Sequence, residues 1–284
     1  MFIMEKKLVI YEPNKYVTAG WLFVWKQMFA ELRSSWNLGF RLFLRDFISK
    51  YKQSLLGLTW VMLLPLFTVL VFVIMNRSGI LNIRNTGVPY PVYALFGISL
   101  WSLFTGLTAS ISGIVGLTGG LITKINFPRI ALIQSPILTS IIDLLIRFVL
   151  LFIVMACYRT TPHAGGFLLP LILLPMLLLS IGIGMFLSII GAVFKDIPNI
   201  INIFLTVAMF ITPVMYPLPD SGFLHAMNLY NPLYYFIEVP RNLFFMGTFQ
   251  HLPVFALFSF VSVVIFFMGW RFYYVAMNRI VEKV

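Results

Sequence analysis

The sequence predicts an all-α integral membrane protein with six membrane-spanning helices. Of its 284 residues, 60% are hydrophobic and only 10% are charged, whereas a soluble domain typically has about 25% charged residues. Long apolar runs recur along the chain, and the first of them, 55–75, holds 21 residues without a charge. A bilayer core of about 30 Å needs about 20 helical residues at about 1.5 Å each. We therefore interpret these runs as membrane spans.

The chain is expected to divide into three parts. Residues 1–21 form a cytoplasmic arm, 22–48 an amphipathic interface helix, and 49–284 a single transmembrane domain. Lys50 and Lys52 precede the first span and place its start on the cytoplasmic side. The six predicted spans cover about 55–75, 92–117, 137–158, 167–193, 199–216 and 253–274.

An apolar stripe at helical spacing predicts the interface helix. Basic residues such as Arg41 and Arg45 fall on other faces, which is typical of a helix that lies at the membrane surface. A soluble helix packed on a partner is the alternative. Gly39 is expected to bend or break this helix, because Gly costs about 1 kcal/mol relative to Ala in a helix. The stripe consists of Leu22, Trp25, Phe29, Leu32, Trp36, Phe40, Phe43 and Phe47.

Basic residues set the expected orientation. With the N-terminus inside, the cytoplasmic segments hold fifteen Lys and Arg residues and the external segments hold four. Short cytoplasmic loops collect cations, so we expect both termini in the cytoplasm. The same rule accounts for the net charge of +11, and we expect no nucleic-acid partner.

Several kinds of site are not expected. A single cysteine, Cys157, excludes an intrachain disulfide and makes a structural zinc site implausible, and no metal site is predicted. No G-x-x-x-x-G-K-[ST] motif occurs, so the chain is expected to bind no nucleotide cofactor through such a loop. The first 16 residues lack the apolar core of a cleaved signal peptide. No catalytic residue is predicted.

The third predicted span carries two charges, Asp143 and Arg147. They are four residues apart and therefore lie on one helix face, with the acid in the favourable N-terminal position. Intramembrane charges cost about 2.5–3.5 kcal/mol each on insertion scales, so they should pair or face a polar space. A pair that fixes helix orientation and a contact with substrate both remain open.

The segment 119–136 between the second and third spans is basic and apolar at once. Its apolar residues need a contact, which a short helix seated on another protein would supply. An extension of a helix end under the lipid headgroups is the alternative. These apolar residues are Leu121, Ile122, Ile125, Phe127, Ile130, Leu132 and Ile133.

The composition of the segment 217–252 predicts that it forms an outer gate. It holds four prolines, yet it stays apolar and aromatic. Two short helices separated by Asn231-Pro232, dipping back from the outer surface, would fit this composition, because non-helical backbone at membrane depth needs protein or a watery cavity beside it. Glu238 and Arg241 are three apart and are expected to pair on its surface. The gate candidates are Asn231, Pro232, Tyr234, Tyr235, Glu238 and Arg241.

Four stretches in order resemble one family. They are YKQSLLGLTW with LLPLF (51–67), NFPRIAL followed by SIIDLL (126–145), FKDIPNI followed by ITPVMYPL (194–218), and NPLYYFIEVPR (231–241). Together they resemble the membrane subunit of ABC-2 type polysaccharide exporters, the permeases that export lipid-linked O-antigen, capsule or teichoic acid. The resemblance covers about residues 22–275.

The resemblance implies a homodimeric, six-span permease in the bacterial inner membrane, driven by two copies of a separate ATPase that binds ATP and Mg. It implies a lipid-linked glycan, O-antigen foremost, as cargo. It places a coupling helix at about 120–134, with the interface helix also meeting the ATPase and gate helices at 223–245. The implied coupling residues are Lys124, Phe127, Pro128 and Arg129, and the implied channel residues on the first and fifth spans are Trp60, Phe67, Phe204 and Phe210.

Three other functions are alternatives to this one. A small-molecule ABC-2 efflux permease is the main alternative, and the response of its ATPase to drugs or to glycolipid would separate the two. An ion-coupled transporter usually shows inverted repeats and more intramembrane charge. A membrane glycosyltransferase would want unpaired acids near a membrane face, but Asp196 and Asp220 are isolated.

Overall fold

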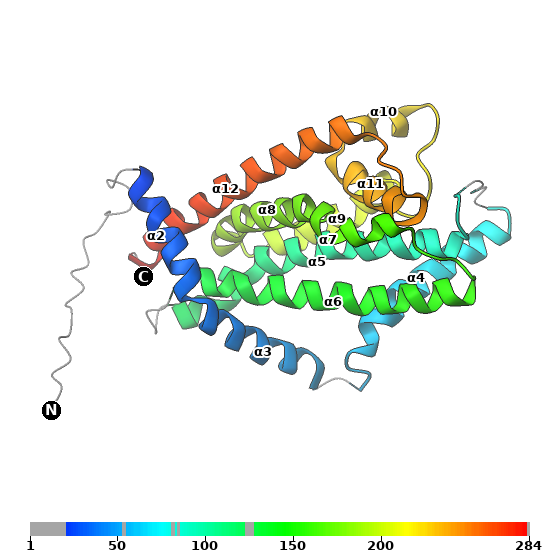
Figure 1. The fold of residues 1–284 in the computed structure, drawn as a ribbon. Helices are drawn as coiled ribbons and strands as arrows, with labels where there is room; N and C mark the ends of the chain where they lie inside the picture. Colours follow the sequence, from blue (N-terminus) through cyan, green and yellow to red (C-terminus); the bar gives the residue numbers. More distant parts are fainter. Residues whose placement is uncertain (1–20, 53–54, 81–82, 84–85, 123–127, 283–284) are drawn as a thin grey trace.

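The computed structural model describes residues 21–52, 55–80, 83, 86–122 and 128–282. Within these ranges every regular element is a helix. The elements are α2 Trp21–Ser34, α3 Trp36–Lys52, α4 Thr59–Arg77, α5 Tyr90–Ile122, α6 Ile130–Cys157, the 3-10 helix η1 Ala164–Leu168, α7 Leu169–Ile172, α8 Leu174–Val193, α9 Ile197–Ile211, α10 Phe223–Leu229, α11 Pro232–Met246 and α12 Leu252–Glu282 (Figure 1).

Five helical segments are long and apolar enough to cross a membrane, and they match five predicted spans. They are Thr59–Arg77, Tyr90–Gly116, Ile130–Cys157, Ala164–Val193 and Leu252–Met277. The remaining predicted span, 199–216, corresponds to α9, which has only 15 residues. At about 1.5 Å per residue, α9 is shorter than a bilayer core of about 30 Å, so the sixth crossing stays a prediction.

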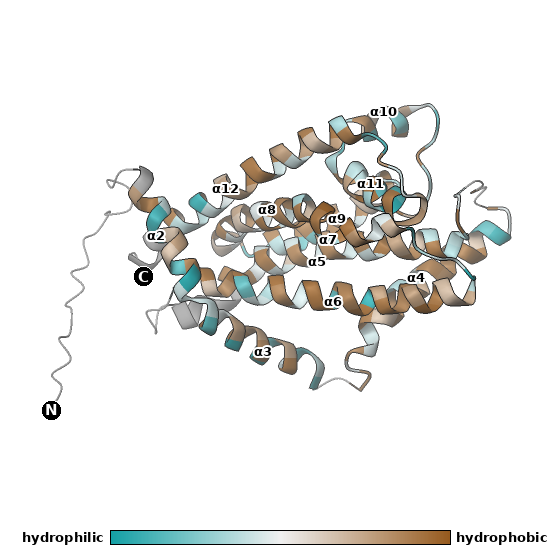
Figure 2. Cartoon of the chain, in the orientation of Figure 1, coloured by the Kyte–Doolittle hydropathy of each residue, from teal (hydrophilic) through white to brown (hydrophobic). Residues whose placement is uncertain are grey.

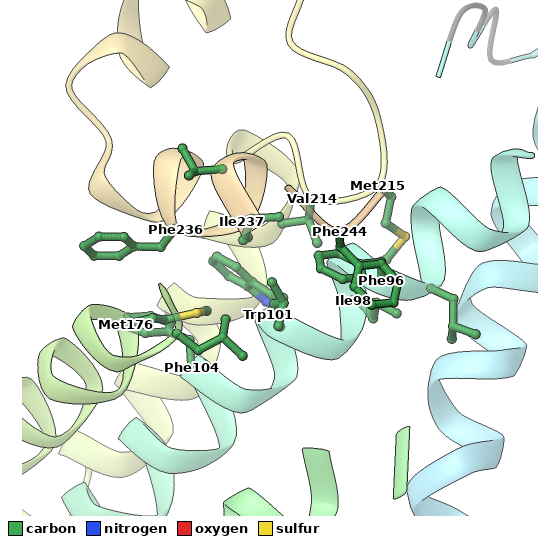
Figure 3. Close-up of a cluster of buried hydrophobic side chains, with 14 of the residues drawn as sticks. Phe96, Ile98, Trp101, Phe104, Met176, Val214, Met215, Phe236, Ile237 and Phe244 are labelled. Atoms are coloured by element: carbon green, nitrogen blue, oxygen red, sulfur yellow. The ribbon is translucent and has the colours of Figure 1, made fainter. Parts of the chain in front are cut away.

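Helix α5 forms the centre of the bundle. In the span Tyr90–Gly116, 72% of an apolar stretch of 18 residues is buried, whereas only 17% of the corresponding stretch is buried in α4 and in α12. Side chains from α8 and α11 surround the α5 residues Phe96 and Trp101 (Figure 3). Figure 2 shows that hydrophobic residues cover the long helices. Because α4 and α12 keep apolar surface exposed, these two helices are suited to contact lipid or another protein.

Helices α8 and α12 meet through two glycines. A Cβ at Gly182 would lie 2.8 Å from Phe266 Cα, and a Cβ at Gly269 would overlap the carbonyl of Gly182. Small residues let helix backbones approach closely in lipid. On α5, a Cβ at Gly97 would be crowded, whereas among the described residues nothing but its own helix backbone lies within 4 Å of a Cβ built at Gly106.

The interface helix is interrupted at Ser35, and the expectation that Gly39 breaks it is wrong. Gly39 lies inside α3, and its would-be Cβ would overlap the side chain of Gln134 on α6. Ser35 donates its hydroxyl to the Leu32 carbonyl at 3.2 Å, a local bond of the kind that competes with regular helix. The glycine therefore serves close packing, and the serine marks the boundary between α2 and α3.

The gate elements and the interface helix lie at opposite ends of the bundle. Helix α2 lies beside the C-terminal part of α12, whereas α10 and α11 lie at the far end of α12 (Figure 1). Two short helices separated at Asn231 are observed as predicted. The long helices thus connect two structurally distinct ends.

The contact between α8 and α12 can be tested with Gly182→Leu. The added side chain would meet the α12 backbone, and overpacking of this kind costs about 1–3 kcal/mol. We expect a lower melting temperature of the purified protein in detergent. Gly106→Leu is the matched control, because nothing lies within 4 Å of that position. Equal melting temperatures for the two variants would contradict the close contact.

Candidate functional site

A buried arginine organises the predicted gate end. Arg241 on α11 is 2% exposed. Its Nη1 donates to Tyr93 Oη and to Glu238 Oε2, both at 2.7 Å, and its Nη2 donates to the Val214 carbonyl at 2.5 Å. The guanidinium also lies 3.8 Å from the centre of the Tyr93 ring, a cation–π geometry. One side chain thereby ties α11 to α5 and to the segment after α9.

The Glu238–Arg241 pair is confirmed, but its predicted place on the surface is wrong. The i, i+3 spacing correctly predicted the ion pair. Arg241 is buried, however, because it contacts residues that are far from it in sequence. Gly97 on α5 makes room for it, because a Cβ there would overlap Arg241 Nη2 and the Val214 carbonyl. Tyr93 and Gly97 were missed by sequence reasoning, since no local pattern links them to residue 241.

Asn231 forms the joint between α10 and α11. Its Oδ1 accepts from the Leu233 backbone N–H at 3.0 Å, which caps α11. Its Nδ2 donates to Thr212 Oγ1 at 2.9 Å and to Asn228 Oδ1 at 3.0 Å. Pro232 occupies the first helical turn, where its missing N–H costs nothing. The joint is therefore held to the end of α9 as well as to α10.

The gate tyrosines are buried in this chain. Tyr234 is 7% and Tyr235 is 3% exposed, and Tyr235 donates its hydroxyl to the Leu229 carbonyl at 3.1 Å. These rings pack as core residues of the gate end. A direct contact between them and a transported molecule would require α11 to move.

The four channel candidates lie on the surface of this chain. Trp60 and Phe67 on α4 are 45% and 55% exposed, and Phe204 and Phe210 on α9 are 69% and 57% exposed. Such rings are available to a channel, to lipid or to a second copy. Their role as a sugar-contacting set stays a prediction.

A cavity of about 510 Å³ lies beside Phe204, among residues of α5, α8, α9, α11 and α12. Its lining is almost wholly apolar. Thr108 on α5 also lines it, and its buried hydroxyl has no hydrogen-bond partner among the residues that the structure describes. The cavity reaches Asn231, so it connects α9 with the joint of the gate end.

The opposite end holds the residues predicted to couple to a partner. Lys124 and Phe127 lie outside the described residues. Arg129 precedes α6, and its carbonyl accepts from Tyr273 Oη on α12 at 3.3 Å. Glu31 on α2 accepts from Tyr274 Oη on α12 at 2.7 Å. Burial raises the pKa of Glu31, while the Tyr274 bond and the charge of Arg129 oppose that rise.

Part of the predicted coupling helix belongs to α6. Its apolar residues were expected to contact another protein, but those in α6 pack within this chain. Ile130, Leu132 and Ile133 are 6%, 5% and 1% exposed, and they pack in a cluster with residues of α2, α5, α8 and α12. Gln134 Nε2 donates to Ser35 Oγ at 3.1 Å, and Ser135 Oγ donates to Asp46 Oδ2 at 2.8 Å. The interface helix therefore covers this apolar surface within the same chain.

The predicted Asp143–Arg147 pair keeps its electrostatic attraction, but the carboxylate makes its hydrogen bonds to α3. Asp143 Oδ2 accepts from Lys50 Nζ at 2.8 Å, and Oδ1 accepts from Tyr51 Oη at 2.7 Å. Both carboxylate oxygens accept hydrogen bonds because the C-terminal end of α3 lies against α6 beside Asp143. Burial and the hydrogen bond to Asp143 raise the pKa of Tyr51, which keeps its hydroxyl protonated as a donor.

No group of three or more His, Cys, Asp or Glu side chains suited to a metal is seen in the described part of the chain. Because this search covers only the described residues, the expectation that the protein has no metal site stays a prediction.

The sequence matches the model of one protein family over residues 38–245, described as ABC-2 type transporter. The chain belongs to this family. The matched region runs from the start of α3 nearly to the end of α11 and thus includes both ends described above.

Three relatives match this chain over most of their own lengths. The O-antigen export system permease protein RfbA of Myxococcus xanthus is 26% identical over 66% of this chain and 73% of its own. RfbA of Klebsiella pneumoniae is 24% identical over 78% and 87%. The polysialic acid transport protein KpsM of Escherichia coli is 25% identical over 71% and 78%.

The buried network can be tested with Arg241→Met, which keeps bulk but removes the charge. Glu238, Tyr93 and Val214 would lose their shared donor, and breaking a buried pair costs about 3–5 kcal/mol. We expect a markedly lower melting temperature in detergent. Glu238→Gln should cost much less, because residue 238 is partly exposed and keeps an acceptor. A smaller effect from Arg241→Met than from Glu238→Gln would refute the assignment.

Proposed function

We propose that the chain is the permease subunit of an ATP-driven exporter that moves a lipid-linked polysaccharide, O-antigen foremost, across the bacterial inner membrane. The observation that carries the proposal is the match to ABC-2 transporters together with relatives named for O-antigen export and polysialic acid transport. Five apolar helices of membrane-spanning length agree with this role. The relatives' names favour a polysaccharide over a small-molecule drug.

A separate ATPase would supply the energy. The chain has no phosphate-binding loop of the G-x-x-x-x-G-K-[ST] type, and we propose two ATPase copies, which bind ATP and Mg, on a permease homodimer. The contact would lie at the end of the bundle where α2, α3 and the start of α6 meet. The hydrogen bonds from Gln134 to Ser35 and from Ser135 to Asp46 support this, because they make α3 and α6 move together.

The sixth crossing would combine α9 with the residues that follow it. Helix α9 and residues 212–216 together have about the 20 residues that a span needs. Val214 and Met215 are buried at 0% and 2% exposure, so this non-helical backbone is covered by protein, as membrane depth requires. With six spans, both termini lie in the cytoplasm and α10–α11 form re-entrant gate helices on the outer side.

The transport step would run from one end to the other. Closure of the ATPase pair on ATP would push the interface helix and the 123–129 segment. The membrane halves would then shift, and the gate helices would open to pass the glycan along Trp60, Phe67, Phe204 and Phe210. Aromatic rings suit a sliding polymer, because sugars present C–H faces as well as hydroxyls.

Coupling can be tested by combining Lys124→Glu with Phe127→Ala. If this segment contacts the ATPase, the change should abolish glycan export while the permease remains in the membrane, because a charge is reversed and an apolar anchor is lost. Export is measured as glycan at the cell surface, and assembly as co-purification of the ATPase. Arg77→Glu reverses a charge at the other end and serves as control. Normal export by the double variant would remove the coupling role.

The cargo can be tested on the purified complex in lipid nanodiscs. We expect a lipid-linked O-antigen glycan to stimulate ATP hydrolysis severalfold, whereas hydrophobic drugs leave the basal rate unchanged. The permease alone, without ATPase, is the background control. Stimulation by drugs but not by glycolipid would instead support the small-molecule efflux permease.

A further inference from the structure

Arg147 is a charged side chain in a membrane-spanning helix whose nearest acid is already engaged. Among the described residues, its Nε is buried and has no hydrogen-bond partner. The carboxylate of Asp143 attracts Arg147 electrostatically, but both of its oxygens accept from α3, from Lys50 and from Tyr51. Nε is therefore a buried donor that no described residue uses.

The charges of this cluster do not balance. Lys50 and Arg147 contribute two positive charges, and Asp143 contributes one negative charge, so one positive charge is in excess. An excess charge in a membrane span is unfavourable, and so is a buried donor without a hydrogen-bond partner. An anionic group at this position would remove both costs.

The geometry suits a phosphate. Arginine presents five N–H donors in a planar fork that matches phosphate oxygens. The Lys50 side chain is 48% exposed, so the cluster is open on that side, and Tyr51 adds a hydroxyl within the same group. The cluster joins the C-terminal end of α3 to α6. This is the level at which an interface helix meets lipid headgroups.

We propose that Arg147, Lys50 and Tyr51 form a binding site for the phosphate of a membrane-lipid headgroup, with Asp143 setting the excess charge at one unit. The phosphate could belong to bulk anionic phospholipid or to the carrier lipid of the cargo. The site follows from the unpartnered Nε of Arg147 and from the excess positive charge of the cluster, so it stands whether or not the proposed cargo is correct.

The test measures lipid binding to the full-length purified protein in neutral detergent. Phosphatidic acid and a polyprenyl diphosphate are the two phosphate-bearing probes, and diacylglycerol is the probe without phosphate. Arg147→Gln should weaken binding of phosphatidic acid about tenfold or more, since a hydrogen bond to a charged group is worth about that factor. Arg159→Gln, an exposed arginine just beyond the other end of α6, is the matched control and should leave binding unchanged.

Asp143→Asn gives a result that a purely structural role would not. It removes the competing acid and raises the excess charge to two, so phosphatidic acid should bind more tightly than to the wild type. If Arg147→Gln does not fold, Lys50→Gln provides a second variant. It frees Asp143 to pair with Arg147 and should weaken binding in the same way.

The two probes assign the source of the phosphate. A loss confined to polyprenyl diphosphate assigns the site to the carrier lipid, and a loss for both probes assigns it to lipid phosphate in general. Unchanged affinity in Arg147→Gln, or equal binding of diacylglycerol and phosphatidic acid by the wild type, would overturn the proposal. Loss of dimer without loss of lipid affinity would also overturn it, because a second copy would then supply the missing anion.

Discussion

A buried cation that cannot reach water must be neutralised and hydrogen-bonded inside the protein, and Arg241 shows what this demand does to the fold. Its partners come from three segments: Tyr93 on α5, Val214 after α9, and Glu238 on α11 itself. None of these contacts can be given up without leaving a charge or an acceptor unsatisfied. The position of α11 and of the chain after α9 therefore follows from one side chain.

The two ends of the bundle are built from different interactions. The end that holds α11 depends on a charged network around the buried Arg241, whereas the interface end depends on hydrogen bonds such as Gln134 to Ser35 and on the apolar cluster around Ile133. Hydrogen bonds between neutral groups can be exchanged for water at a small net cost.

Hydropathy and spacing predicted the helical class, five of the spans and the division at Asn231, because these features are local. They did not predict the partners of Arg241 or Asp143, because Tyr93 and Lys50 are far away in sequence and no local period links them. The Gly39 prediction was wrong for a related reason. Its small size is used against Gln134, a contact that exists only once α3 lies on α6.

Arg241 and Arg147 together show why a membrane charge must be judged by its partners and not by its presence. Both lie in apolar helices, and each has an acidic residue three or four positions before it in the sequence. The acid of Arg241 stays with it, while the acid of Arg147 is taken by α3. In both arginines the buried Nε has no hydrogen-bond partner among the described residues, but both Nη atoms of Arg241 donate to groups of the same chain. These bonds fix the position of α11, because any displacement would break them. The acid next to Arg147 is bound by α3, and for this reason we propose a partner from outside the chain for Arg147 and an internal, structural role for Arg241.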